Sequence, residues 1–153
     1  MKKISENISY KEATHSATAK KLGLQNKPSK EHIKNMETLA EKVFQPLREW
    51  VGGPIKVNSF YRSEELNTAI KGSFKSSHLT GQAIDITSIG GKTNLEMFHY
   101  IKDNLDFDQL IWEFGEEPIW LHISYKNKKN NRKQILVTKK QGKYFTYQDC
   151  KDC

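Results

Sequence analysis

The sequence has few cysteines and few prolines, and it has no long hydrophobic run. Only 2 of its 153 residues are cysteine and 4 are proline. Cys150 and Cys153 form one C-x-x-C motif, which is too little for a disulfide framework and half of a zinc-finger ligand set. A functionally neutral tail over about residues 148–153 is therefore favoured over a redox or metal role. No segment approaches the ~20 apolar residues of a membrane span, so none is expected.

Residues 1–7 contain two lysines but no apolar stretch behind them, so they lack the hydrophobic segment of a secretory signal. We therefore expect synthesis in the cytoplasm, and action outside the cell would need another route of release. A composition of 36% hydrophobic and 28% charged residues is typical of folded proteins. A chain of this length is most simply one domain, residues 1–153, and we expect a monomer.

Acidic residues are outnumbered, with 18 Asp and Glu against 25 Lys and Arg, and the net charge is +7. This excess favours a polyanionic partner, and both nucleic acid and the anionic bacterial wall qualify. No nucleic-acid-binding motif supports the first, so no specific nucleic acid is expected. The basic, Asn-rich residues 126–133 would either attract anionic wall polymer or form a solvated connection.

Capping signals and apolar spacing predict four helices. They cover residues 10–22, 30–51, 64–70 and 94–104. Pro46 lies within the second of these and removes a backbone donor, so a kink is expected near residues 42–46.

Alternating apolar residues predict six strands, whereas the polar, Ser/Gly-rich residues 74–81 predict a loop. The strands cover residues 54–60, 82–87, 107–114, 119–125, 134–138 and 143–147. The third and fourth would form an antiparallel hairpin through Gly115-Glu116-Glu117-Pro118, and the last two another around Gln141-Gly142. Because helices come first and paired strands later, the sequence predicts an α+β domain with N-terminal helices packed on a small antiparallel sheet.

Three scattered side chains suit a metal site. His78 ends the predicted loop, and Asp85 follows on a strand after the turn at Gly81. His122 alternates with Leu121 and Ile123, so it lies on the opposite face of its strand from these aliphatics. A catalytic zinc ion takes three ligands from His, Asp and Glu and leaves one position for water.

Histidine and aspartate also have more ordinary roles. His15, His32 and His99 fall in predicted helices, where a surface role is the default, and Asp85 could form a salt bridge instead. Two histidines and a carboxylate also make the facial triad of non-haem iron enzymes. That triad has a close His-x-Asp/Glu pair, whereas six residues separate His78 from Asp85, so zinc is favoured.

Several spaced motifs together resemble the D-alanyl-D-alanine carboxypeptidase-like metallopeptidases, which share a fold with the hedgehog signalling domain and lysostaphin-type peptidases. The motifs are Ser59-Phe60-Tyr61-Arg62-Ser63 with Asn67, Ser77-His78-x-x-Gly81-x-Ala83-x-Asp85, and Trp120-x-His122-x-Ser124. The resemblance covers about residues 11–125. It implies a zinc peptidase that cuts peptidoglycan stem peptides or cross-links, as phage endolysins and wall-remodelling enzymes do.

The resemblance also assigns roles by position. It makes His78, Asp85 and His122 the zinc ligands, and Arg62 the group that stabilises the oxyanion, where a surface ion pair is the alternative. It makes Ser77 a substrate-binding residue. Tyr61 and Trp120, with Phe60 and Trp112, would either wall the cleft or pack in the core.

The general base departs from the family pattern. Many relatives have Glu or Asp three residues before the last histidine, but Ile119 occupies that position here and cannot take a proton. Glu113 at the predicted strand end resembles the glutamate of the hedgehog-like branch and is our first choice. Glu117 in the turn is the second. Without a usable base, the same fold would be a zinc-containing binding module.

Overall fold

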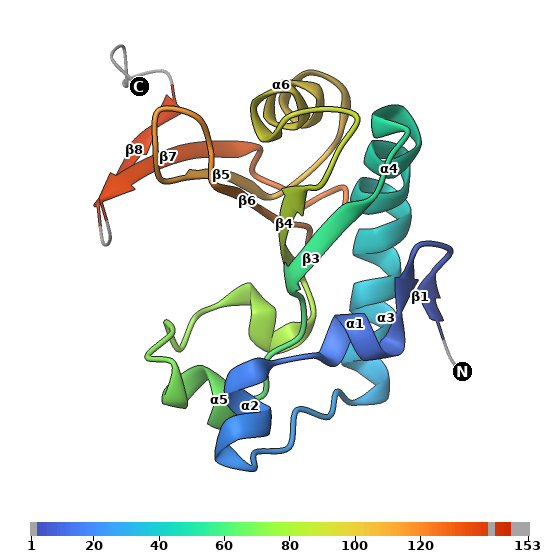
Figure 1. Cartoon of the computed structure of the whole chain (residues 1–153), viewed down its shortest axis with the longest axis vertical. Coiled ribbons are helices and arrows are strands. Elements are labelled where there is room, and N and C mark those ends of the chain that lie inside the picture. Colours follow the sequence, from blue (N-terminus) through green and yellow to red (C-terminus); the bar gives the residue numbers. More distant parts are fainter. Residues whose placement is uncertain (1–2, 141–142, 148–153) are drawn as a thin grey trace.

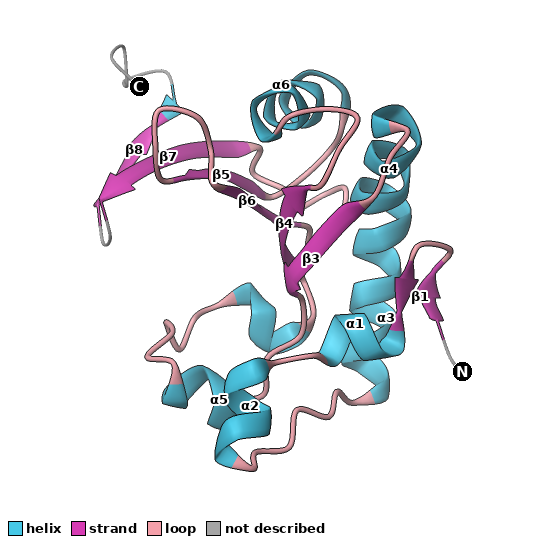
Figure 2. Cartoon of the chain, in the orientation of Figure 1, coloured by secondary structure: helices cyan, strands magenta, loops and turns pink. Residues whose placement is uncertain are grey.

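The computed structural model describes residues 3–140 and 143–147. It shows one sheet of six strands with helices against one face, and a separate two-stranded hairpin near the N-terminus (Figures 1 and 2). The predicted α+β class is confirmed. The predicted turn at Gln141-Gly142 and both cysteines lie outside the described residues.

The first half of the chain is mainly helical. Its elements are β1 (Lys3–Ser5), β2 (Ile8–Ser9), α1 (Tyr10–Thr14), α2 (Ala17–Leu22), α3 (Lys30–Leu39), the π-helical turn η1 (Ala40–Phe44), α4 (Gln45–Val51), β3 (Ile55–Ser59) and α5 (Glu64–Ala69). The second half contains the 3-10 helix η2 (Ser77–Thr80), β4 (Ala83–Ser88), α6 (Asn94–Asn104), β5 (Gln109–Glu113), β6 (Trp120–Ser124), β7 (Gln134–Lys140) and β8 (Lys143–Thr146).

Side-chain caps begin the helices where the sequence predicts them. Capping boxes open α1 at Ser9, α3 at Ser29 and α6 at Thr93, and Ser63 caps α5. A serine or threonine oxygen accepts from a free amide of the first turn, which removes the cost of leaving that amide unpaired.

Two local predictions were wrong. The helix expected over residues 10–22 is split, because His15 is extended and Ser16 accepts from the amide of Ala19 to start α2. The loop expected over residues 74–81 contains η2, which Ser76 caps by accepting from the amide of His78. In both places a serine side chain replaces a missing backbone partner and starts a new element.

The irregularity expected near Pro46 is present as η1. Pro46 lies in the first turn of α4, directly after this π-helical turn. Since proline donates no amide and crowds the preceding turn, the wider turn removes the conflict without ending the helix. The three segments therefore continue as one long rod beside the sheet (Figure 1).

The sheet has the strand order β3-β4-β6-β5-β7-β8. Its pairs are antiparallel except β5 with β7, which are parallel, so the sheet is mostly rather than wholly antiparallel. The hairpin of β1 and β2 was not predicted, because its strands are only 3 and 2 residues long. No described helix combines the length and apolar character needed to cross a bilayer.

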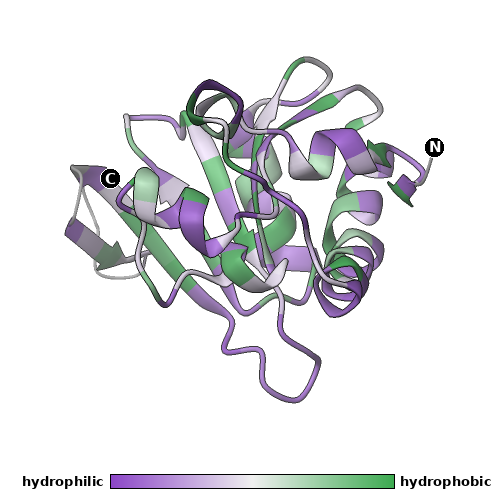
Figure 3. Cartoon of the chain, turned by 90° about the horizontal axis from the view of Figure 1, so that it is seen from below, coloured by the Kyte–Doolittle hydropathy of each residue, from purple (hydrophilic) through white to green (hydrophobic). Residues whose placement is uncertain are grey.

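The helices cover one face of the sheet and leave the other open. Ile84, Ile86, Leu121 and Ile123 on the covered face are at most 1% exposed and pack with residues of α3, α4 and α6. Hydrophobic segments accordingly gather between these layers (Figure 3). Strand alternation directs the intervening residues of β4 and β6 to the open face.

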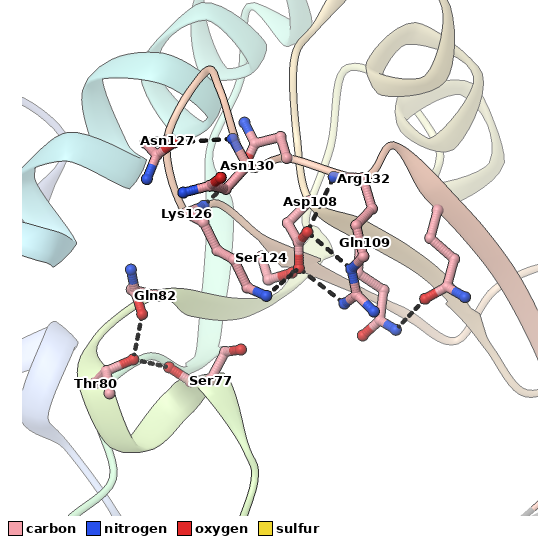
Figure 4. A network of polar contacts seen from close by, with 12 residues as sticks. Ser77, Thr80, Gln82, Asp108, Gln109, Ser124, Lys126, Asn127, Asn130 and Arg132 are labelled. Atoms are coloured by element: carbon pink, nitrogen blue, oxygen red, sulfur yellow. Dashed lines mark hydrogen bonds and ion pairs between the residues drawn. The ribbon is translucent and has the colours of Figure 1, made fainter.

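A buried carboxylate fixes the parallel pair. Asp108, just before β5, is fully buried and accepts hydrogen bonds from Arg132 at Nε (3.0 Å), Nη2 (2.9 Å) and the backbone amide (3.0 Å), as Figure 4 shows. Gln134 donates its amide to the carbonyl of Asp108 at 2.9 Å, which aligns the start of β7 with the start of β5. The basic loop over residues 126–133 is thus anchored at its end by a charge-assisted network.

Gly81 gives a first prediction. Its φ is +74°, and a Cβ added there would lie 2.6 Å from the carbonyl oxygen of His32. Gly23 has a similar φ of +69°, but no atom lies within 4 Å of a Cβ added to it. Gly23→Ala should therefore lower the free energy of unfolding by only about 1 kcal/mol, the cost of holding an alanine in the left-handed conformation. Gly81→Ala should lower it by about 3 kcal/mol, because the new Cβ also collides with the carbonyl oxygen of His32. Urea unfolding of both variants measures the difference, and equal costs would contradict a tight contact between η2 and α3.

Candidate metal centre and active site

Sheet register places two of the predicted ligands side by side. Asp85 in β4 is paired directly with His122 in β6, and His122 is paired with Ile111 in β5. The side chains of Asp85 and His122 lie on the open face, and His122 Nδ1 is 2.9 Å from Asp85 Oδ1. The predicted separation of His122 from Leu121 and Ile123 is present, since both aliphatics are fully buried in the core.

The third predicted ligand, His78, comes from η2. Its Nδ1 lies 2.7 Å from the carbonyl oxygen of Phe60, which can only accept, so Nδ1 carries the proton. Its Nε2 then carries a lone pair. This atom is buried, lies 3.2 Å from Asp85 Oδ2 and has no hydrogen-bond partner among the described residues. The backbone thereby fixes both the tautomer and the direction of this ring.

These three residues fit a metal ion. Their ligand atoms all lie within 4.8 Å of one another. A lone pair on Nε2 facing a carboxylate oxygen is unfavourable unless a cation or a proton lies between them, and a buried polar atom without a partner is costly. Imidazole nitrogens with one carboxylate are the ligand set of catalytic zinc sites.

The electrostatics of Asp85 agree with this assignment. Burial alone would raise its pKa, but the two imidazoles beside it, His78 and His122, outweigh burial and hold the pKa well below the usual range. The carboxylate therefore stays ionised at neutral pH, as a metal ligand must.

Arg62 lies beside the three ligands. Its backbone amide donates to the carbonyl of His78 at 3.1 Å, and its Nη2 donates to Ser76 Oγ at 3.3 Å. Its Nε is buried and lacks a partner among the described residues. Burial lowers the pKa of Arg62, and Asp85 partly offsets this. A guanidinium with a free, desolvated donor is available to an incoming carbonyl or carboxylate.

Glu113 is the last residue of β5 and lies on the same face as His122. It is paired with Trp120 of β6 and is 8% exposed, and burial, together with Asp85, raises its pKa to about 7 against the opposing effect of His122. Phe114 follows with φ +60°, which ends the strand there. Glu117 and Ile119, by contrast, are exposed in the turn between β5 and β6.

A cavity of about 580 Å³ opens beside Asp85. Tyr61 and Trp120 line it, whereas its lining does not include Ser77. Phe60 and Trp112 are 1% and 4% exposed and belong to the core, so they do not wall the cleft.

Sequence reasoning missed two residues of this site. Ser76, rather than Ser77, bonds to Arg62, because η2 places the hydroxyl of its own capping residue there. Lys56 lines the cavity from β3. The alternation of its predicted strand could have revealed Lys56, whereas nothing in the sequence separates two adjacent serines. The carbonyl of Ser77 instead accepts from the hydroxyl of Thr80 (Figure 4) and from the backbone amide of Gln82.

An open face carrying a His-Asp-His group, a buried arginine and a glutamate with a raised pKa is the arrangement of a metal-dependent hydrolase. The family model described as Peptidase M15 matches residues 6–124, and the chain therefore belongs to the Peptidase M15 family of zinc metallopeptidases. The chain has no match among curated proteins. Family and ligand set together support a zinc peptidase with a peptide substrate.

Zinc binding gives a second prediction. Metal-free protein should bind one zinc ion per chain in calorimetry and melt at a higher temperature with zinc, because the ion binds only the folded site. His78→Ala should abolish this binding, whereas His99→Ala, on α6, should retain it. The double variant Cys150→Ser/Cys153→Ser should also retain it. Undiminished binding by His78→Ala would contradict the site, and loss in the cysteine variant would place the ion at the tail.

The buried carboxyl of Glu113 gives a third prediction. Its pKa is about 7 when folded and roughly 4.3 when unfolded, so the folded state binds more protons between these values and stability falls as pH rises through them. Metal-free Glu113→Gln should therefore be more stable than the parent at pH 8, by about 1–2 kcal/mol after a discount for solvent screening. At pH 4.5 this advantage should nearly vanish. Urea unfolding at both pH values measures it, with the exposed Glu117→Gln as control; a pH-independent difference would contradict the raised pKa.

Proposed function

We propose that this chain is a zinc-dependent peptidase that hydrolyses amide bonds in peptidoglycan stem peptides or cross-links, in the manner of a D-alanyl-D-alanine carboxypeptidase or a related endopeptidase. The observation that supports it most is the convergence of a metal-ligand set with a separate carboxyl group on the same face of the sheet. His78, Asp85 and His122 would hold the ion, and Glu113 would serve as the base.

Zinc, when bound, lowers the pKa of water and polarises the carbonyl that is attacked. Glu113 takes a proton from the attacking water and returns it to the departing amine. Both transfers need a carboxyl that acts as base and then as acid near neutral pH, and burial raises the pKa of Glu113 to about 7 in the metal-free protein. Arg62 donates to the carbonyl oxygen as negative charge develops there. Both groups are held by backbone, Glu113 at a strand end and Arg62 by its bond to the carbonyl of His78.

The charges of the cavity favour a substrate with a carboxylate. Lys56 and Arg62 line the cavity, and Asp85, which would be neutralised by a metal ion, is the acidic residue among its lining. A peptide with a free carboxylate near the scissile bond would be attracted by these two cations. The D-Ala-D-Ala terminus and the D-Glu residue of stem peptides both provide one.

The biological setting belongs to the same proposal. As an endolysin, the enzyme would reach the wall through phage lysis or as part of a virion. The net charge of +7 and the basic loop over residues 126–133 would favour approach to an anionic wall. A nucleic-acid partner would predict binding that weakens steeply with salt.

A fourth prediction separates an enzyme from a binding module of the same fold. Glu113→Gln should retain stoichiometric zinc but lower kcat on purified muropeptides by roughly 10²- to 10⁴-fold, because it cannot accept a proton. Mass spectrometry of the digest identifies the bond cut. Glu117→Gln tests the runner-up base, and loss of turnover there with full activity in Glu113→Gln would exchange the two roles. Zinc binding without cleavage of any muropeptide by the parent would overturn the peptidase and leave the binding module.

A further inference from the structure

The hairpin of β7 and β8 lies outside the residues that the family model matches, 6–124. It continues the sheet past β5, on the side away from β6 and β4 (Figure 1). The open face on which the metal ligands lie therefore extends over two further strands. Side chains of the hairpin on that face are neighbours of Glu113 rather than of the core.

Register identifies which side chains these are. Glu113 in β5 is paired with Thr138 in β7, and Ile111 with Leu136, which is paired in turn with Thr146 in β8. Since Ile111 is paired with His122, Thr146 lies on the face of the metal ligands. Alternation places Tyr144 on the same face, two residues from Thr146. The register of β7 with β8 shifts between Val137 and Lys140, so Tyr144 lies opposite the irregular segment that contains Thr138, one strand beyond Glu113.

The reach of a tyrosine suffices to bring its hydroxyl near the site. Two strands separated by one intermediate strand are roughly 10 Å apart, and a tyrosine side chain that leans across Thr138 spans most of that distance. Burial raises the pKa of Tyr144, and the charges of Glu113 and Asp85 raise it further. The residue as a whole is 52% exposed. Half of the residue is therefore open to solvent, while the charges of both carboxylates still act on its hydroxyl.

Tyr144 is available to a ligand. The hydroxyl of Tyr144 has no hydrogen-bond partner among residues 3–140 and 143–147. A raised pKa keeps it protonated at neutral pH, so it is a donor. Arg62 lies on the other side of the metal group, near β3, so Tyr144 and Arg62 flank the site from opposite ends of the sheet.

We propose that Tyr144 is a substrate-binding residue whose hydroxyl donates to a peptide carbonyl on the side of the scissile amide away from Arg62. The peptide then crosses the strands, with its carboxylate toward Lys56 and Arg62 and its other end over Glu113 and the hairpin. This assignment rests on the proposed peptidase function and extends the site to residues beyond the family match.

Tyr144→Phe provides the test, because it keeps the ring and removes only the hydroxyl. With full-length zinc-loaded protein and defined muropeptides, KM should rise about 3- to 10-fold, as expected for one hydrogen bond, while kcat changes less than twofold. Zinc content and melting temperature should not change. Tyr100→Phe is the matched control, since Tyr100 stacks on Trp50 at 4.2 Å, on the helix-covered side of the molecule, and should leave KM unchanged.

A binding measurement makes the test independent of turnover. In the Glu113→Gln background, calorimetry with the same muropeptides should show Kd weakened 3- to 10-fold when Tyr144→Phe is added. Unchanged KM and Kd would overturn the proposal, as would a shifted pH profile at constant KM, which would mean that the hydroxyl acts on Glu113. If the parent binds but cleaves nothing, the peptidase function fails and the calorimetry still decides on Tyr144. If it neither binds nor cleaves, both fail.

Discussion

The site depends on the pairing of Asp85 with His122 across β4 and β6. A carboxylate is disfavoured in the interior of a sheet, and here two imidazoles offset its burial. The register that makes this contact is fixed by the other face, where Ile84, Ile86, Leu121 and Ile123 fill the core. A slip of one residue would exchange the two sets, so the hydrophobic effect positions the metal ligands.

The helices determine which face of the sheet can carry the His-Asp-His group. The rod formed by α3, η1 and α4, together with α6, covers the aliphatic face and leaves the polar face to the cavity. His78 is brought in by contacts with the chain on both sides: its ring bonds to the carbonyl of Phe60, and its own carbonyl accepts from Arg62. These backbone bonds hold η2 against the end of β3, so a ligand from a loop is nearly as constrained as the two from strands.

Much of this could be predicted from the sequence where the signal is local. Capping boxes at Ser9, Ser29 and Thr93 gave helix starts, and the alternation around His122 gave its face. The wrong helix and loop boundaries came from local serine caps at Ser16 and Ser76, whereas the strand order depends on contacts between distant residues. The parallel pairing of β5 with β7 follows from Asp108 bonding Arg132, and neither residue shows a pattern that indicates its partner. The metal set was found only because several motifs occur together; the spacing of His78, Asp85 and His122 alone leaves iron and a salt bridge open.

The order of strands also has a consequence for how a peptide can lie. The cavity with Arg62 and Lys56 is at the β3 edge, the metal group lies over β4 and β6, and Glu113 is on β5, next to the β7–β8 hairpin. The positive charges, the His-Asp-His group and the carboxyl of Glu113 thus follow one another across the strands rather than along them. A substrate that contacts all three must cross the sheet, and the parts of it on either side of the scissile bond meet residues from different halves of the chain. In the proposed binding mode, residues near the middle of the sequence, within the family match, would contact the carboxylate side of the substrate. The other side would meet a hairpin that Asp108 and Arg132 hold in place, so substrate preference on that side could change while the His-Asp-His group stays the same.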